Sequence, residues 1–500
     1  MMKTASLLLL LLAAEAYAYP SNYVLVTQST ATERSECLST SYFGSYGRPV
    51  PHKVYFPAES CYGLATSLLE SGAVLYLSDD DRESRTLLWV QEAGVDDSAR
   101  GDALSFSAEL DRLAQLTLRD AHLQDETTSL GAEQVIMSSG SSTTSPAVNV
   151  IYRDSANALI SVPSHALPYI DALLPRLFVP IALPFSPLPQ GSTPVPSDAV
   201  HRVQKLLTGL RFSPIIASII DSLSINQMKR DIRWLTGEDG EGPLSRHSFS
   251  RGALEAADWI QRQFEKTGAR CEQKPFLQGF APNVVCRYPS SGKDDSLVVL
   301  SAHYDSRGSF GSTRAPGGDD DGSGVIHLLA IARSIFENKV TFKSNVELIA
   351  FAGEEQGLLG SRAYAKELKA ADTNVTLMIQ ADMLAYHSPS EPAQVGFPDI
   401  IGLPEATYLV GNITNIYSPE LTVGYTPACC SDHQSFHEVG YPSTWVFERA
   451  GSILDPMYHN SGDISNRTGY DFKQVQSIAK ATFATLLEVA GFEIEEEDRQ

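Results

Sequence analysis

The sequence predicts an α/β fold: a mixed, mostly parallel sheet with helices on both faces, preceded by a smaller α+β domain. In the second half of the chain, strand-like apolar runs alternate with helical patterns. Acidic residues and histidines follow several of these runs, where the active residues of such a sheet lie. A Pro-rich stretch at 184–197 separates two halves of different character. The length of 500 residues also favours about two or three domains.

The first half, residues 19–183, is predicted to be either a small α+β domain or a propeptide. Short alternating apolar runs at Tyr23–Val26 and Ala73–Leu77 indicate strands, and a polar Ser/Thr tract covers 138–145. This half contains no catalytic constellation. A propeptide would assist folding or cover an active site until its removal, but the sequence shows no defined processing site. Both interpretations stay open.

The second half, residues 198–492, begins with helical spacing at 215–220 and again at Ala253–Phe264. In chain order we then expect a strand at Leu297–Ser301, a helix at Gly324–Phe336, a strand at Val346–Phe351, a helix at Gly360–Leu368 and a strand at Thr376–Ala381. This order predicts parallel strands covered by helices. Residues 493–500 form an acidic tail.

The N-terminus and the charge predict a secreted, extracellular protein. Lys3, the apolar run Leu7–Leu12 and Ala16-Tyr17-Ala18 have the form of a signal peptide over 1–18. The apolar run is shorter than the ~20 residues of a spanning helix. Lys plus Arg number 38 against 60 Asp plus Glu, a formal charge of -22. This excess argues against nucleic acid and anionic membrane surfaces as partners.

Three sequons, at Asn374, Asn412 and Asn466, agree with a secretory route and predict N-glycans. We expect the mature chain to act as a monomer.

Six cysteines suit an oxidising compartment. Their spacing suggests two local pairs, Cys37 with Cys61 and Cys271 with Cys286. The adjacent Cys429 and Cys430 could form a vicinal pair or join others. Because six cysteines allow many pairings, the connectivity stays open.

Residues 303–355 carry the strongest sign of chemistry. His303 ends a strand, and Asp305 can accept a hydrogen bond from the imidazole nitrogen that faces away from a metal. An acidic run such as Asp319–Asp321 is more often a solvated loop. Here glycines let the backbone bend, and three packed like charges are unfavourable unless cations neutralise them. One of the three could bridge two cations.

Further carboxylates and an imidazole complete the pattern. Glu354 and Glu355 follow an apolar strand and point in different directions, so one can bind metal while the other acts as base. Asp382 ends another strand, and His459 supplies a second imidazole far along the chain. His327 is assigned to packing or solvent. Together these residues predict a metal-dependent hydrolase.

These motifs, taken in order, resemble the co-catalytic di-zinc aminopeptidases, the secreted leucine-aminopeptidase type of bacteria and fungi. The resemblance covers about 200–490 and leaves 19–197 out. The matching segments are 303–306, 318–324, 353–361, 381–383 and 458–459.

The resemblance implies two Zn²⁺ ions per chain. One zinc would be held by His303 and Asp382, the other by Glu355 and His459, and Asp320 would bridge them. The family's spacing before Gly-Ser-Gly selects Asp320 from the acidic run.

The resemblance also implies catalytic roles. Glu354 would be the general base for a metal-bridging hydroxide, Tyr458 would help to stabilise the oxyanion, and Ser431-Asp432-His433 would support the site. The predicted function is a secreted zinc aminopeptidase that hydrolyses N-terminal residues from peptides. Two alternatives stay open: a glutaminyl-cyclase-like acyltransferase, which uses one zinc on the same scaffold, and a non-catalytic, receptor-like binding module.

Overall fold

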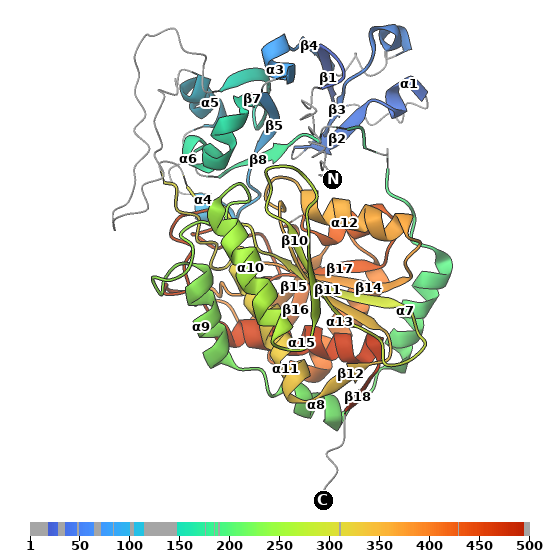
Figure 1. Cartoon of the computed structure of the whole chain (residues 1–500). Helices are drawn as coiled ribbons and strands as arrows, with labels where there is room; N and C mark the ends of the chain where they lie inside the picture. The colour runs from blue at the N-terminus through green and yellow to red at the C-terminus, as the bar shows by residue number, and fades with distance from the viewer. Residues whose placement is uncertain are drawn as a thin grey trace, which may run out of the picture.

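The computed structural model describes most of the chain in two bodies, one above the other in Figure 1. The predicted signal peptide, the Ser/Thr tract, Cys429 and residues 495–500 lie outside the described residues. The described ranges are 19–28, 36–47, 50–64, 72–83, 85–100, 105–114, 148–175, 177–184, 186–188, 191–309, 312–428 and 430–494.

The smaller body, residues 19–183, is the N-terminal domain. It holds two antiparallel four-stranded sheets. Their strand orders are β2(Tyr42–Tyr46)-β3(His52–Tyr55)-β1(Tyr23–Thr27)-β4(Gly72–Tyr76) and β6(Asn149–Arg153)-β7(Asn157–Pro163)-β5(Arg85–Glu92)-β8(Phe178–Ala182). Short helices accompany the sheets, among them α4(Asp97–Arg100), α5(Phe106–Ala114) and α6(Ile170–Leu173). The predicted α+β character is confirmed, and both predicted strands are present as β1 and β4.

The larger body, residues 198–492, is the C-terminal domain, and a six-stranded sheet forms its centre. The order is β17(Ser443–Val446)-β14(Val375–Ala381)-β11(Leu297–His303)-β13(Asn345–Phe351)-β10(Asn283–Tyr288)-β9(Arg270–Lys274). The first four strands are mutually parallel, whereas β10 and β9 pair antiparallel. The sheet is therefore mixed and mostly parallel, as predicted. All of β11 is buried, which explains its mostly apolar sequence.

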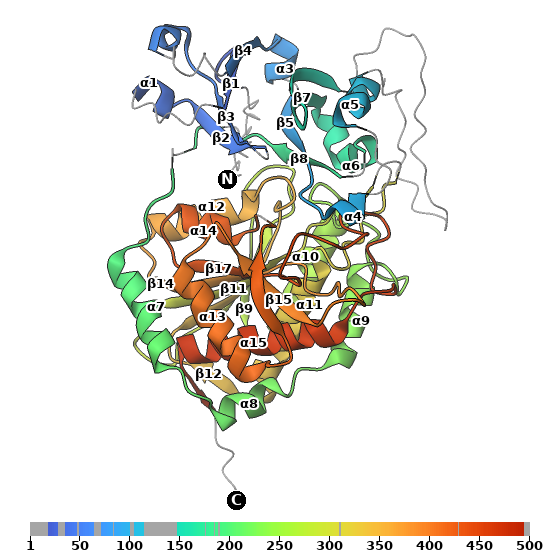
Figure 2. The ribbon, with the colours of Figure 1, turned by 180° about the vertical axis from the view of Figure 1, so that it is seen from behind.

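Helices cover both faces of this sheet. Alternate strand residues, such as Val298 and Leu300, pack in one cluster with α10(Arg251–Glu265), α11(Gly322–Glu337) and α15(Phe472–Ala490) (Figure 1). The intervening residues, such as Val299, pack with α12(Leu359–Ala370) and α14(His433–Glu438). At the β17 side, α13(Pro404–Tyr417) packs against α7(Ser197–Gly209) (Figure 2). The expected helices at 253–264, 324–336 and 360–368 are confirmed as α10, α11 and α12.

Smaller elements complete the C-terminal domain. α8(Pro214–Ile220) contains the predicted helix at 215–220, and α9(Ile225–Leu235) follows it. Two further pairs of strands are β15(Gln394–Pro398)-β16(Thr422–Thr426) and β12(Val340–Phe342)-β18(Phe492–Ile494). The first two residues of the predicted acidic tail therefore belong to β18. Among the described residues no single helix could cross a membrane by length and hydropathy, although α7 and α8, bent by 100°, pass that test as a pair.

The disulfide between Cys271 and Cys286 joins β9 to β10, where the two residues lie opposite each other. This predicted pair is confirmed. Cys61 and Cys430 are also disulfide-bonded. The side chain of Cys37 and the whole of Cys429 lie outside the described part of the chain, so their pairing stays a prediction.

Candidate metal centre

The parallel strands bring distant residues to one edge of the sheet. His303 is the last residue of β11, Asp382 follows β14, and Glu354 and Glu355 come shortly after β13. Because these strands run in the same direction, their carboxyl ends meet at one edge. The loop before α11 brings Asp320 to the same place.

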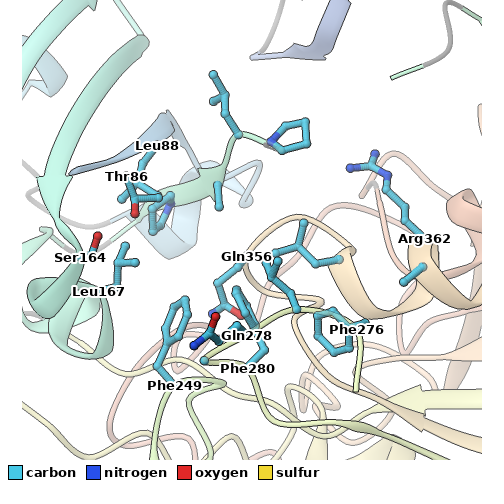
Figure 3. A pocket seen from close by; sticks show the side chains of 18 of the residues that line it. Thr86, Leu88, Ser164, Leu167, Phe249, Phe276, Gln278, Phe280, Gln356 and Arg362 are labelled. Atoms are coloured by element: carbon cyan, nitrogen blue, oxygen red, sulfur yellow. The ribbon is translucent and has the colours of Figure 1, made fainter. Parts of the chain in front are cut away.

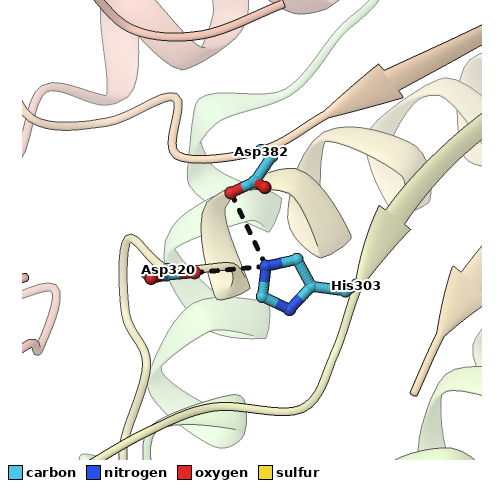
Figure 4. Close-up of side chains that lie close together, drawn as sticks. All are labelled: His303, Asp320 and Asp382. Atoms are coloured by element: carbon cyan, nitrogen blue, oxygen red, sulfur yellow. Dashed lines mark ion pairs between the residues drawn. The ribbon is translucent and has the colours of Figure 1, made fainter. Parts of the chain in front are cut away.

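The structure gathers the five predicted ligands into two groups that share Asp320. In the first group, His303 Nε2 lies 3.1 Å from Asp320 Oδ1 and 3.6 Å from Asp382 Oδ1 (Figure 4). In the second, His459 Nε2 lies 3.1 Å from Asp320 Oδ2 and 3.0 Å from Glu355 Oε2. Each oxygen of Asp320 thus faces a different histidine, as a bridging carboxylate requires.

The donor set fits a pair of divalent cations such as zinc, since imidazole nitrogens and carboxylate oxygens are its usual ligands. All five side chains are buried. Among the described residues no hydrogen-bond donor reaches Oε1 of Glu355. Burial and the neighbouring Asp320 raise the pKa of Glu355 well above its ordinary value. A buried carboxylate with an unpaired oxygen is suited to a cation that neutralises it.

The ring of His303 is oriented by a hydrogen bond on the side that faces away from the site. Nδ1 of His303 lies 3.1 Å from the carbonyl oxygen of Asp305, and a carbonyl can only accept, so Nδ1 carries the proton and Nε2 faces the site. The predicted acceptor, Asp305, is confirmed; its carboxylate lies farther from Nδ1 than its carbonyl, at 3.6 Å. That carboxylate instead accepts from the backbone N–H groups of Glu354 and Glu355, at 3.3 and 3.2 Å. The Asp305 side chain therefore fixes the loop after β13, while its carbonyl orients His303.

The other two members of the acidic run face into the fold. The Asp319 carboxylate accepts from the backbone N–H of Ala385 at 2.8 Å and Tyr386 at 3.2 Å. Asp321 caps α11 through the N–H of Gly324 at 2.8 Å. Both carboxylates therefore hold the loops in place and leave Asp320 to face the centre, which agrees with the choice made from the sequence.

Two further predicted residues lie beside the two groups. Glu354 Oε2 is 3.9 Å from His303 Nε2, and burial raises the pKa of Glu354 well above its ordinary value. The ring of Tyr458 stacks on that of His459, with centroids 3.8 Å apart. Burial and then the Asp320 charge raise the pKa of the Tyr458 hydroxyl well above its ordinary value. That hydroxyl stays protonated and can donate a hydrogen bond.

Other residues singled out from the sequence lie outside the two groups. Asp432 accepts from Gln380 Nε2 at 3.2 Å, and the His433 ring stacks on Trp445. Both are buried beside the centre. His327 is buried on α11, 2.6 Å from the Thr482 hydroxyl, as expected for a packing role.

A cavity of about 630 Å³ opens onto Asp320, Glu354, Asp382 and His459, and both domains line it. Its apolar residues from the C-terminal domain include Met383, Ile400, Trp445, Phe447 and Ile453. The N-terminal domain adds residues of three segments, 45–51, 91–94 and 179–181.

A second, mostly apolar cavity of about 840 Å³ lies between the domains. Phe249, Phe276 and Phe280 face Leu88 and Leu167 across it (Figure 3). Arg362 lines both cavities.

Comparison with known proteins agrees with this geometry. Residues 283–485 match the model of peptidase family M28. A probable leucine aminopeptidase of Arthroderma otae is 30% identical over 298 residues, which span 56% of this chain and 76% of that protein. This chain belongs to peptidase family M28. It is therefore a peptide-bond hydrolase, and the family implies zinc as its metal.

A second relative agrees with the assignment, and two solved structures share the fold. Leucine aminopeptidase 1 of Sclerotinia sclerotiorum is 29% identical over 296 residues, 54% of this M28 peptidase and 73% of the relative. The LapA aminopeptidase of Legionella pneumophila has the same fold, with a TM-score of 0.53 and 19% identity over 71% of this chain and 96% of LapA. LapB of that organism gives a TM-score of 0.53 at 18% identity, over 69% and 95% of the two chains.

Sequence reasoning missed one contact at the centre. Arg307, in the loop after β11, lies between the metal-ligand candidates and Asp171 of the N-terminal domain. A separation of 136 positions leaves no local pattern from which to predict this pair.

Proposed function

We propose that this M28 peptidase is a secreted aminopeptidase that removes N-terminal residues from peptides with two zinc ions. The observation that carries the proposal is the position of Asp320, with one oxygen toward each histidine. His303 and Asp382 would hold one ion, Glu355 and His459 the other, and Asp320 both. When bound, the ions would activate a water and polarise the scissile carbonyl.

Glu354 is the proposed general base. Its carboxylate lies beside the ligands without belonging to either group, so it is free to take a proton from the attacking water and pass it to the leaving amine. Desolvation raises the pKa of Glu354, so its carboxylate takes up a proton more readily.

Tyr458 is the proposed oxyanion donor. It lines the same cavity as Glu354, and its raised pKa keeps the hydroxyl in the donating form. A donor of this kind stabilises the negative charge that develops on the carbonyl oxygen during attack.

The shape of the site supports action at a chain end. A cavity of about 630 Å³, walled by both domains, suits the end of a peptide better than the middle of a folded chain. Its apolar wall, including Trp445 and Phe447, suits an apolar first side chain. The names of the fungal relatives, leucine aminopeptidases, agree with this preference.

Secretion and glycosylation belong to the same proposal. The three sequon asparagines, Asn374, Asn412 and Asn466, are exposed and so accessible to glycosylation. The Cys271–Cys286 disulfide suits an oxidising compartment.

The activity is tested with free-amine and N-acetylated copies of the same peptides on the zinc-loaded protein. We expect release of the first amino acid from the free-amine peptides alone. Equal cleavage of both copies would count against an aminopeptidase. Cyclisation of N-terminal glutamine with one zinc per chain would support the glutaminyl-cyclase alternative, and zinc binding without turnover would support the non-catalytic module.

A further inference from the structure

An ion pair joins the two domains next to the His459 and Glu355 side of the candidate metal centre. Arg307 Nη2 and Nε lie 2.7 and 3.0 Å from Oδ1 of Asp171, a residue of α6 in the N-terminal domain. The backbone N–H of Gly308 donates to Oδ2 of the same carboxylate at 3.3 Å. The side chains of Arg307 and Asp171 are only 3% and 7% exposed. The pair is thus held away from solvent and fixed by several contacts.

The other side of Arg307 contacts the second group of ligand candidates. Its Nη1 lies 3.3 Å from Nδ1 of His459. A zinc ion on Nε2 would require the proton on Nδ1, and a guanidinium can only donate, so this contact is packing and not a hydrogen bond to a zinc ligand. Its Nε lies 4.0 Å from Oε2 of Glu355. Arg307 therefore packs against the His459 ring and stands beside the Glu355 carboxylate, its neighbour of opposite charge in this group.

The charge of Arg307 makes Asp171 necessary. Without Asp171, this buried guanidinium would repel two nearby cations, and its remaining acidic neighbour, Glu355, is itself a proposed ligand. Asp171 neutralises it. His247 Nε2 also approaches this carboxylate, at 3.5 Å. A carboxylate from the N-terminal domain thus balances a cation that touches two proposed zinc ligands.

Neighbouring contacts hold the same loops. The backbone N–H of Ala182 donates to the carbonyl of Gln356, directly after Glu355, at 3.0 Å. The backbone N–H of Asp96 donates to the carbonyl of Ile453, in the loop that leads to His459, at 2.8 Å. The N-terminal domain therefore contacts the chain on either side of the Glu355 and His459 group.

We propose that Asp171 is a positioning residue of the metal centre: through Arg307 it holds the Glu355 carboxylate in place, so the N-terminal domain is a lasting part of the site. The inference rests on the two-zinc site of the proposed function. It also separates the two interpretations of residues 19–183, because a propeptide that left after cleavage would take Asp171 with it.

The test measures zinc release from the full-length, zinc-loaded protein to an excess of a coloured chelator. Asp171→Asn keeps the size of the side chain and removes its charge, and Arg307→Lys keeps the charge and loses the planar fork. The matched control is Asp96→Asn. The Asp96 side chain pairs across the same domain interface with Arg449, at 3.7 Å, away from the ligands, and the substitution leaves the backbone contact with Ile453 in place. Thermal unfolding of each apo-protein reports whether it is folded.

We expect one of the two zinc ions to leave about tenfold faster in Asp171→Asn and in Arg307→Lys, with the other ion unchanged. Asp96→Asn should release zinc as the wild type does. Wild-type release rates for both ions in a folded Asp171→Asn protein would overturn the proposal. If Asp171→Asn does not fold, wild-type release in Arg307→Lys overturns it instead. Peptide hydrolysis by the wild type is scored separately, so loss of the proposed activity is not mistaken for loss of this role.

Discussion

The backbone N–H of His303 donates a hydrogen bond to Oδ2 of Asp321, with nitrogen and oxygen 3.1 Å apart. Oδ1 of the same carboxylate accepts from the backbone N–H groups of Gly324 and Met383, at 2.8 and 3.2 Å. One buried side chain therefore ties together the end of β11, the start of α11 and the residue after Asp382.

Asp321→Ala should accordingly lower the free energy of unfolding by about 3 kcal/mol, because three buried N–H groups lose their acceptor. Urea unfolding of the metal-free protein measures the loss without any contribution from zinc binding. A change below about 0.5 kcal/mol, the level of an ordinary surface substitution, would contradict this role for Asp321.

Glu354→Ala should retain zinc and lower kcat by at least about 100-fold, since the carboxylate is assigned as base and not as ligand. Zinc content and peptide hydrolysis are measured on the same sample. Unchanged hydrolysis would remove Glu354 as the base, and loss of zinc would make it a ligand.

Tyr458→Phe keeps the ring that stacks on His459 and removes only the hydroxyl. We expect kcat to fall by about 100-fold with little change in KM, because the hydroxyl is assigned to the transition state. A higher KM at unchanged kcat would show instead that the hydroxyl binds the substrate in its ground state.

The His387 and Asp471 pair predicts a pH dependence of stability. Nδ1 of His387 lies 2.8 Å from Oδ2 of Asp471. Burial acts against the charged imidazole, but the hydrogen bond from Asp471 outweighs it and raises the pKa of His387 above 6.5. Burial likewise opposes ionisation of Asp471, but hydrogen bonds from His387 and the backbone lower its pKa below 3.8.

The pair is therefore fully stabilising between these two ordinary values. Its contribution is lost as the pH rises through the raised pKa of His387 or falls through the lowered pKa of Asp471. Since the pair is partly solvated, His387→Gln should cost only about 0.5 kcal/mol near pH 5.5 and almost nothing near pH 9. Urea unfolding at both pH values checks this, and a larger cost at the higher pH would reverse the assigned sign.

Strand ends made much of the metal centre predictable. His303, Glu355 and Asp382 follow buried apolar strands, and parallel pairing brings such ends together whatever lies between them in the chain. The family spacing selected Asp320, and the structure supplies the physical reason: the carboxylates of Asp319 and Asp321 are occupied by backbone N–H groups.

The contribution of the N-terminal domain could not be predicted. Asp171 lies in a helix of four residues with no motif around it. Arg307 lies in a loop, where no hydrophobic periodicity indicates which way a side chain points. Their contact depends on how two domains pack, which no local pattern records. The strand β17 could not be predicted either, for a different reason: its four residues are too few for a clear strand pattern.

The central claim is that Asp320 bridges two zinc ions. Anomalous diffraction at the zinc edge, from crystals of the zinc-loaded full-length protein, tests it most directly. We predict two peaks of similar height about 3.5–4 Å apart, one on each side of the Asp320 carboxylate. A single peak beside His303 and Asp382, with none beside Glu355 and His459, would contradict it.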